Sequence, residues 1–449
     1  MPDTPNTFDV IVIGSGPGGY VAAIRSAQLG LSTVVIERDD VVGGRCLNYA
    51  CIPAKAVLRS ADVLSEVREA GEFGINLNGA EPTVDFDAVS ERRTKVIGTL
   101  TGGVSGLFKK NGVELISGEA SLTADGGVKV ADTVYTANKA VILATGSVKK
   151  PLPGLDFGGN VIGTEEAWAL TAVPETLAVI GAGASGTEIA SAYQRLGAQV
   201  TLYEGLDRVL PTEDADISKA AARGFKKQGI EVRTDTFFDP ADVGNYEWVV
   251  IAAGRAPDVA ALGLDVAGVA LTDAGLIEVD GALKTSKDKV YAIGDLVPGP
   301  ALAHKASDEG IIAVEAAAGH ATHPISYIDI PRATFCTPNV GSFGLTEAQA
   351  REQGYDVTVG KVQYGAVGAG TVYGDRTGVI KIVGEKKYGE MLGAHIVGTK
   401  ATELIQELVN VRLLEGGYAE VARMIHGHPT LSEGVMEAAR AADGWLIHG

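Results

Sequence analysis

Two cysteines lie five positions apart, at Cys46 and Cys51, and their thiols are the most chemically specific groups in the sequence. In a regular helix that separation places the two Cα atoms about 8.5 Å apart, whereas a disulfide requires less than about 7 Å. The segment must therefore depart from ideal helix geometry if the sulfurs bond, and a bond formed under such constraint is easily reduced. A helix that begins here is also expected to lower the thiol pKa values through its dipole. The spacing predicts a redox-active dithiol/disulfide pair.

Two other interpretations of these cysteines stay open from spacing alone. Zinc sites pair cysteines at closer spacing and require two more ligands, and no further ligands lie nearby, so no metal site is expected. Two unrelated buried cysteines are the second alternative. Cys336, in an apolar strand pattern, is expected to be a core residue of that kind.

A glycine-rich turn precedes the cysteines, with Gly14, Gly16 and Gly19 in the G-x-G-x-x-G pattern. These glycines allow a tight turn and a close approach to a pyrophosphate at the N-terminus of a helix. Glu37 follows Gly19 by eighteen residues, at the end of the next strand, where a carboxylate binds a ribose hydroxyl. The pattern predicts a first dinucleotide site, which we assign to FAD.

The same pattern returns at Gly181, Gly183 and Gly186, and Glu204 again follows by eighteen residues. A carboxylate at this position repels a 2′-phosphate, so the second site is predicted to bind NAD rather than NADP. Arg208 is the nearest basic residue that could reverse this preference. Two dinucleotides on one chain indicate electron transfer between them.

Further candidate cofactor residues follow apolar strands. Thr145, Gly146 and Gly254 lie where each fold is expected to return to its cofactor. Asp295 is placed to bind the ribityl chain of the flavin, with a helix-capping or turn aspartate as the alternative.

His428 and Glu433 near the C-terminus form a candidate base and the carboxylate that orients it. A thiol substrate needs a base that titrates near neutral pH, and imidazole supplies one. A histidine beside a proline turn is more often structural, so spacing alone leaves the role open.

The elements that must position these residues form two strand–helix–strand units and a different C-terminal pattern. Prolines and a glycine at 151–154 suggest a linker between the two units. From about residue 331 short strands alternate with helices, as in an α+β domain. The predicted fold class is α/β, with two Rossmann-like dinucleotide-binding domains and a C-terminal α+β domain. The predicted segments are strands 8–13, 32–36, 176–180, 199–203 and 289–295, and helices 20–30 and 187–196.

The composition narrows the class of protein. The chain has 449 residues and a formal net charge of −18, which disfavours a nucleic acid partner because phosphate binding needs clustered Lys and Arg. No signal peptide or membrane span is expected, since no apolar run is long enough. Three cysteines do not form a structural disulfide framework, so a cytoplasmic location is predicted, where thiols stay reduced.

Together these motifs resemble the flavoprotein disulfide reductases, the class I pyridine nucleotide-disulfide oxidoreductases, along nearly the whole chain. The most specific segments are 46–55, 291–295 with 302–306, and 428–433, and the last is similar to the lipoamide branch rather than the glutathione branch. The resemblance implies an FAD-binding domain (1–149), an NAD-binding domain (150–268), a central domain that completes the FAD site (269–330) and a dimer-interface domain (331–449).

The resemblance also implies an activity, namely oxidation of dihydrolipoyl groups by NAD⁺ through the disulfide and FAD. In that scheme His428 deprotonates a substrate thiol, the thiolate attacks Cys46, and Cys51 faces the flavin. The implied partners are a second copy of the chain, whose disulfide the His428–Glu433 pair would serve, a lipoyl-bearing domain or small disulfide, and a 2-oxo acid dehydrogenase complex.

The residues implied at the cofactors extend beyond the glycine motifs. Lys55 would pair with Glu188 beside the flavin. The full FAD set is Gly14, Gly16, Gly19, Glu37, Gly44, Lys55, Gly118, Thr145, Gly146, Asp295 and Ala303, and the NAD set is Gly181, Gly183, Gly186, Glu188, Glu204 and Gly254.

The cysteine segment departs from the family pattern at Arg45, Tyr49, Ala50 and Ala54, and the stretch 234–249 is shorter than usual. None of these changes removes a catalytic group. Arg45 is expected to lower the pKa of Cys46 by charge proximity. The alternatives are an NAD(P)H-dependent reductase of another low-molecular-weight disulfide, and a flavin-bearing redox sensor without turnover.

Overall fold

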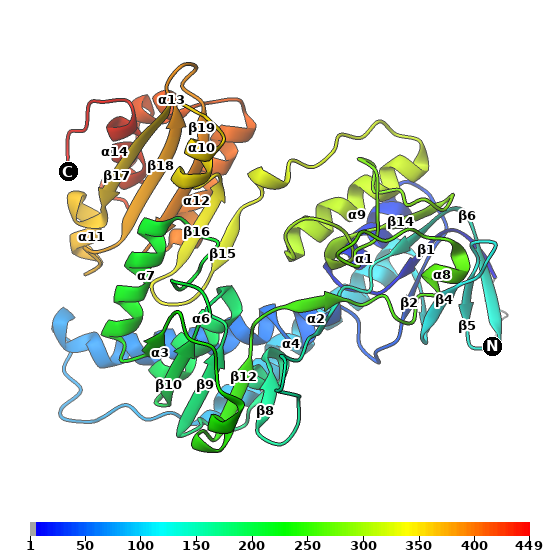
Figure 1. Cartoon of the computed structure of the whole chain (residues 1–449), viewed down its shortest axis with the longest axis horizontal. Coiled ribbons are helices and arrows are strands. Elements are labelled where there is room, and N and C mark those ends of the chain that lie inside the picture. The colour runs from blue at the N-terminus through cyan, green and yellow to red at the C-terminus, as the bar shows by residue number, and fades with distance from the viewer. Residues whose placement is uncertain (1–5) are drawn as a thin grey trace. The chain divides into compact units, whose positions relative to one another are not determined.

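The computed structural model describes residues 6–449, which form two compact units (Figure 1). The first unit contains residues 6–56, 90–150 and 254–327, and the second contains 57–89, 151–253 and 328–449. Two helices, α3 (Cys51–Glu69) and α4 (Phe86–Asn111), run from one unit into the other.

A seven-stranded, mostly parallel sheet forms the centre of the first unit. Its strands are β1 (Thr7–Ile13), β2 (Thr33–Glu37), β3 (Glu114–Ser117), β4 (Ala120–Leu122), β5 (Val128–Val130), β6 (Thr133–Leu143) and β14 (Val290–Ala292). The order is β3-β2-β1-β6-β5-β4, and β14 also pairs with β6. Strands β3, β2, β1, β6 and β14 are parallel, whereas β4 and β5 extend β6 as an antiparallel meander. Every residue of β2 is buried, as expected for a parallel strand covered on both faces.

Short helices and one further strand pair complete the first unit. Helix α1 (Pro17–Gln28) contacts α9 (Ala303–Ala318), and the apolar side chains of β1, β2 and β6 fill the core on both faces of the sheet. The remaining elements are α2 (Gly44–Asn48), α8 (Leu264–Ala267), and the antiparallel pair β7 (Ser147–Lys149) and β13 (Arg255–Pro257).

The second unit contains a fully parallel five-stranded sheet. Its elements are β8 (Val161–Gly163), α5 (Thr164–Ala169), β9 (Thr176–Ile180), α6 (Ala184–Leu196), β10 (Gln199–Tyr203), α7 (Ala215–Lys227), β11 (Glu231–Arg233) and β12 (Trp248–Ile251). The strand order is β11-β10-β9-β12-β8, with β9 at the centre. The crossover through α6 between two parallel strands is the same device as the crossover through α1 in the first unit.

An antiparallel five-stranded sheet with helices packed on it follows in the same unit. Its elements are β15 (Arg332–Thr334), β16 (Val340–Gly344), α10 (Glu347–Glu352), β17 (Val357–Gln363), α11 (Gly368–Val372), β18 (Val379–Glu385), β19 (Met391–Val397), α12 (Ala401–Leu413), α13 (Tyr418–Arg423) and α14 (Ser432–Ala442). The order is β15-β16-β19-β18-β17, and α12 and α14 supply apolar side chains to its core.

These observations confirm the predicted fold class, two parallel dinucleotide-type folds followed by an α+β domain. The strand predicted over 289–295 is shorter, because β14 ends at Ala292 and residues 294–296 form a 3-10 turn that begins with Gly294 at φ +72°. Helix α4, strand β16 and the β4–β5 hairpin had no sequence prediction. The short stretch 234–247 contains one 3-10 helix between β11 and β12.

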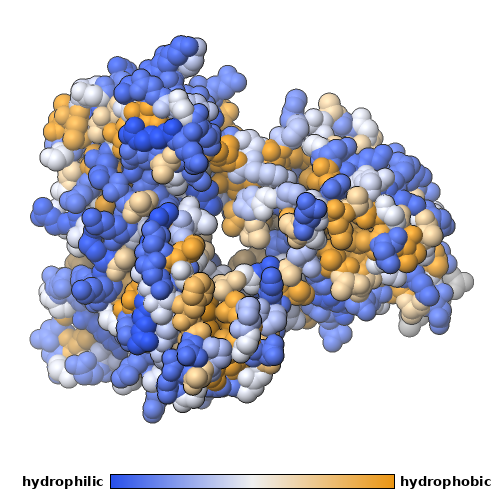
Figure 2. Space-filling view, viewed as in Figure 1, coloured by the Kyte–Doolittle hydropathy of each residue, from blue (hydrophilic) through white to orange (hydrophobic). Residues whose placement is uncertain are grey.

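On the face shown in Figure 2, hydrophilic residues are interspersed with smaller hydrophobic patches. Among the described residues, no helix has both the length and the apolar character needed to cross a bilayer.

Candidate active site

The helix that carries Cys46 ends before Cys51, so the two cysteines lie on either side of a break. Helix α2 finishes at residue 48, and Tyr49 leaves helical geometry with φ −130°. The amides of Tyr49 and Ala50 both donate to the carbonyl of Arg45, at 2.9 Å each, and α3 begins at Cys51. The predicted departure from ideal helix geometry is therefore present between the two cysteines.

The two thiols contact each other and are partly buried, and neither is in a disulfide. The hydrogen bond with Cys51, followed by burial, raises the pKa of the Cys46 thiol, although Lys55 and Arg45 act in the opposite direction. The prediction that a helix dipole would lower the pKa of Cys46 is wrong, because the neighbouring sulfur and the loss of solvent outweigh it.

Cys336 is separate from this pair. Its side chain is fully buried, its Sγ lies 3.2 Å from the carbonyl oxygen of Pro338, and burial raises its pKa to about 12. The prediction that it is a core residue is confirmed.

In the first glycine-rich turn, Gly19 lies against the backbone of Gly14, whereas Gly16 faces open space. A Cβ atom on Gly19 would lie 1.9 Å from the carbonyl oxygen of Gly14, so only glycine lets α1 approach β1 this closely. A Cβ on Gly16 would meet no atom within 4 Å, and α1 begins there without a side-chain cap or an acidic residue in its first turn. An open cradle at an uncapped helix N-terminus fits the pyrophosphate of FAD.

Glu37 links this turn to the cysteine segment. Its Oε2 accepts hydrogen bonds from the amide and the hydroxyl of Ser15, at 2.8 and 2.5 Å, and the Ser15 hydroxyl accepts from the amide of Gly43 at 3.1 Å. A Cβ on Gly44 would lie 2.6 Å from the Cα of Gly16. The cradle and the start of α2 are therefore in direct backbone contact. Sequence reasoning missed Ser15, since a serine between two glycines carries no separate signal.

The other predicted FAD residues gather at the same edge of the first sheet. Strands β1, β2, β3, β6 and β14 are parallel, so the residues that follow them lie at their common carboxyl ends, where dinucleotides bind. Thr145 donates to the carbonyl of Asp258 at 2.7 Å, and the Ser147 hydroxyl donates to Asp295 at 2.5 Å. The predicted residues at or just beyond this edge are Gly14, Glu37, Gly118, Thr145, Gly146 and Asp295, and Ala303 begins α9 in the same unit.

The second glycine-rich turn repeats the first in detail. A Cβ on Gly186 would lie 1.8 Å from the carbonyl oxygen of Gly181, whereas one on Gly183 would meet nothing within 4 Å. Glu204 accepts from the amide of Ala182 at 2.8 Å, as Glu37 does from Ser15. The residues fit a second dinucleotide. Gly254 belongs to the first unit, so its predicted contact with NAD stays a prediction.

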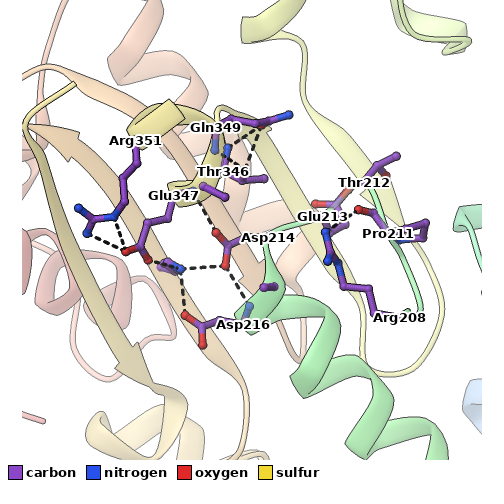
Figure 3. A pocket seen from close by; sticks show the side chains of 13 residues that line it. Arg208, Pro211, Thr212, Glu213, Asp214, Asp216, Thr346, Glu347, Gln349 and Arg351 are labelled. Carbon is purple, nitrogen blue, oxygen red and sulfur yellow. Dashed lines mark hydrogen bonds and ion pairs between the residues drawn. The ribbon is translucent and has the colours of Figure 1, made fainter. Parts of the chain in front are cut away.

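Arg208, the residue that could favour NADP, is directed elsewhere. Its guanidinium donates to the carbonyl of Pro211 at 3.2 Å and lines a pocket of about 520 Å³ together with α10 (Figure 3). Of Glu204 and Arg208, it is therefore Glu204 that hydrogen-bonds to the backbone of the second glycine-rich turn.

His428 and Glu433 form the predicted pair. The Nδ1 of His428 lies 2.9 Å from the carboxylate of Glu433, whose other oxygen accepts from the amide of Thr430 at 2.8 Å. Burial alone would raise the pKa of Glu433, but the Thr430 amide and His428 together lower it. The ionised carboxylate orients the ring, and 76% of the His428 side chain is exposed, so Nε2 is accessible to a substrate.

The neighbouring His426 is a different kind of histidine. Its Nε2 lies 2.6 Å from Glu407, its side chain is 6% exposed, and the bond with Glu407 raises its pKa. The structure therefore distinguishes two histidines that the sequence places two positions apart.

Lys55 and Glu188 lie in different units, so their predicted pairing stays a prediction. Lys55 acts on Cys46 by lowering its pKa. Glu188 is buried on α6 and accepts from the amide of Phe335 at 2.8 Å.

Two models of known protein families match this chain, one over its N-terminal part and one over its C-terminal part. Residues 8–310 match the pyridine nucleotide-disulphide oxidoreductase model, and residues 330–439 match the dimerisation domain of the same group. The chain is 41% identical over 465 residues to a dihydrolipoyl dehydrogenase of Zymomonas mobilis, covering 98% of this chain and 99% of the relative. It is 40% identical over 465 residues to a dihydrolipoyl dehydrogenase of Mycobacterium tuberculosis, with the same coverage.

Two solved structures are also similar. LpdA from Mycobacterium tuberculosis matches with a TM-score of 0.86 and 25% identity, over 96% of this chain and 99% of that one. The Cu(II) complex of the HOCl-induced flavoprotein disulfide reductase RclA from Escherichia coli matches with a TM-score of 0.85 and 25% identity, over 98% and 99%.

Proposed function

This chain belongs to the pyridine nucleotide-disulphide oxidoreductase family, and we propose that within it the chain is a dihydrolipoyl dehydrogenase. Family membership confirms the predicted enzyme class, an oxidoreductase that acts on a sulfur group and uses FAD and NAD(H). The observation that carries the proposal is the helix break that puts the thiols of Cys46 and Cys51 in contact beside the first glycine-rich turn.

Different residues of the chain are assigned to the two cofactors. The open side of the first turn at Gly16 and the N-terminus of α1 would hold the FAD pyrophosphate, and Asp295 would hold the ribityl chain. Gly183 and Glu204 would hold NAD in the second unit. When bound, FAD carries two electrons between the cysteine pair and the nicotinamide.

The thiol chemistry depends on His428 and on the Cys46–Cys51 pair. The Nε2 of His428 takes the proton of one dihydrolipoyl thiol, and the thiolate attacks the Sγ of Cys46 in the oxidised pair. The Cys46–Cys51 bond breaks, and Cys51 leaves as the thiolate. The second substrate thiol then displaces Cys46, which takes a proton, so that lipoamide leaves and the reduced pair remains.

We further infer a homodimer in which His428 and Glu433 of one protomer act on the disulfide of its partner. The match of residues 330–439 to the dimerisation domain supports this, as do exposed apolar side chains in that region such as Leu413, Leu414 and Ile425. We also infer a lipoyl-bearing domain of a 2-oxo acid dehydrogenase complex as the partner, and a cytoplasmic location. The four domain boundaries and the Lys55–Glu188 pair belong to the same proposal.

A second candidate function is reduction of another low-molecular-weight disulfide. It is favoured by Tyr49, which is exposed in the cysteine segment, and by the structural similarity to RclA. Assays with NADH and either lipoamide or glutathione disulfide separate the two. Lipoamide reduction is the expected result, and turnover with glutathione disulfide but not lipoamide would overturn the first proposal.

The role of the cysteine pair has a spectroscopic test. Anaerobic titration of the holoenzyme with NADH is expected to produce a long-wavelength charge-transfer band between the Cys51 thiolate and oxidised flavin. Cys51→Ser should abolish the band, whereas Cys336→Ser, which changes the buried thiol, should retain it. A band that persists in Cys51→Ser would exclude this residue as the donor.

A further inference from the structure

A fully buried ion pair lies on α9, outside the thiol chemistry. The Nζ of Lys305 is 3.1 Å from a carboxylate oxygen of Glu309, and both side chains are 0% exposed. Removing two charges from water is costly unless additional hydrogen bonds satisfy their remaining donors and acceptors.

The pair holds one residue, Gly294, from both sides. Lys305 Nζ donates to the carbonyl of Gly294 at 2.7 Å, and the amide of Gly294 donates to the other oxygen of Glu309 at 2.7 Å. Gly294 has φ +72°, and a Cβ there would lie 3.2 Å from the Cβ of Ala306. Both polar groups of a turn in the left-handed region are therefore fixed by charged partners. Such bonds are stronger than those between neutral groups.

The next residue is Asp295, at the carboxyl end of β14. Its carboxylate accepts from the hydroxyl of Ser147, which in turn accepts from Arg255 at 2.8 Å. The orientation of the Gly294 peptide sets where the Asp295 side chain begins, so the ion pair and Ser147 together define its direction.

Helix α9 also packs against the start of α1, where the first glycine-rich turn lies. A Cβ on Gly310 would lie 2.6 Å from the carbonyl oxygen of Gly18, and one on Gly18 would lie 2.9 Å from the carbonyl oxygen of Ala306. Helices α9 and α1 are thus in backbone contact. Because α9 contacts both the turn at Gly294 and the start of α1, its position fixes where these two segments lie relative to each other.

We propose that Lys305 and Glu309 are positioning residues of the flavin site, which fix the Gly294 turn so that Asp295 meets the polyol chain of FAD in register with the pyrophosphate at α1. This inference rests on the proposed FAD site and concerns neither the thiol substrate nor the nicotinamide. The two residues act through Gly294 and contact no reacting atom.

The test measures how fast FAD leaves the holoenzyme. Glu309→Leu and Lys305→Met are expected to release FAD at least about tenfold faster than wild type, as seen in the rise of free-flavin fluorescence after dilution. Glu309→Gln retains an oxygen that can accept from Gly294 and should show a smaller increase. The visible circular dichroism of the bound flavin should change in the same order, and Asp295→Asn gives the effect of losing the contact itself.

Two control variants separate positioning from general stability. Tyr327→Phe removes a hydroxyl that donates to Glu309 at 2.6 Å but leaves both bonds to Gly294, so FAD release should stay near the wild-type rate. Glu437→Gln alters a buried carboxylate in the second unit and should lower thermal stability without changing FAD release.

Release rates within about twofold of wild type in both Glu309→Leu and Glu309→Gln would overturn the inference, whether or not Lys305→Met folds. Wild-type protein that holds FAD but fails to turn over lipoamide would overturn the proposed function and leave this inference standing.

Discussion

Arg45 lies next to Cys46 and is one of two positive charges that lower the pKa of that thiol. Replacing it in Arg45→Thr removes a charge that favours the thiolate, so the pKa of Cys46 should rise further. Alkylation of Cys46 in the reduced protein, followed by mass spectrometry of its peptide, should therefore shift to higher pH. Arg59→Thr on the neighbouring helix α3 is a matched control, because Arg59 pairs with Glu66 instead. Superimposable curves for wild type and Arg45→Thr would contradict the prediction.

Glu433 fixes which nitrogen of His428 faces a substrate. Glu433→Gln should lower kcat for lipoamide reduction by about 10²-fold or more, because the ring loses its orienting carboxylate. FAD content should be unchanged. Glu407→Gln makes the same change beside His426 and should leave kcat near the wild-type value. Equal losses in both variants would mean that the two histidine pairs have the same structural role.

At the residue scale, the chemistry was more predictable than the electrostatics. The types and spacing of Cys46 and Cys51 sufficed to predict a break in the helix, because disulfide geometry excludes a regular one. The direction of the Cys46 pKa shift was not predictable, since it depends on burial and on the contact with the second sulfur. His426 and His428 also differ in exposure and in their partners, because His426 is buried against Glu407 whereas His428 is exposed beside Glu433.

At the scale of elements, the two glycine-rich turns offer paired tests of packing and binding. Gly186→Ala would place a Cβ 1.8 Å from a backbone oxygen, so the free protein should lose about 1–3 kcal/mol of stability. Gly183→Ala faces open space, so the stability of the free protein should be retained while NADH binding weakens. Thermal unfolding without nucleotide and NADH titration distinguish the two effects. Unaltered NADH affinity in Gly183→Ala would show that this side of the turn does not face the dinucleotide.

Regular elements with strong apolar patterns were predicted within a few residues, and others were missed for identifiable reasons. Strands β1, β2, β9 and β10 are mostly apolar because both faces of each sheet are covered. Helix α4 contains glycines at 98, 102, 103 and 106, which weaken the helical signal. Strand β16 contains two glycines among five residues, and its burial comes from pairing with β15 and β19.

For the whole molecule, the number of folds was predictable but their partition into compact units was not. Residues 57–89 belong with the second unit, and contacts such as that of Asp62 with Arg195, at 2.5 Å, join segments 133 residues apart. Local patterns carry no information on such pairs. β14 likewise joins the first sheet although Val290 pairs with Val141 of β6, 149 positions earlier in the chain.

In the second unit, the ion pairs of Lys381 join segments that are distant in the sequence, and their contribution to stability can be predicted from charge. Lys381 on β18 is 3% exposed and pairs with Asp214, which caps α7, at 2.8 Å, with Asp216 at 2.9 Å and with Glu347 on α10 at 2.8 Å (Figure 3). It thus connects the parallel fold to the antiparallel sheet. Lys381→Met leaves the buried carboxylate of Asp214 without its cation, whereas Asp216 keeps Lys361 and Glu347 keeps Arg351. The apoprotein should lose about 3–5 kcal/mol of stability at pH 7.

The size of that loss should depend on pH in a stated direction. Burial alone would raise the pKa of Asp214 and Asp216, but Lys381 lowers both, and it lowers the pKa of Glu347 through their hydrogen bond. A carboxyl group with a lowered pKa stabilises the fold above its unfolded value of about 4, and the contribution disappears as the pH falls through the folded value. The difference in unfolding free energy between wild type and Lys381→Met, measured by urea denaturation, should therefore shrink as the pH is lowered below about 4. Lys386→Met removes an exposed partner of Asp356 and should have little effect at any pH. A deficit in Lys381→Met that stayed constant into acid would mean that Lys381 stabilises the sheet through its apolar stem rather than through these carboxylates.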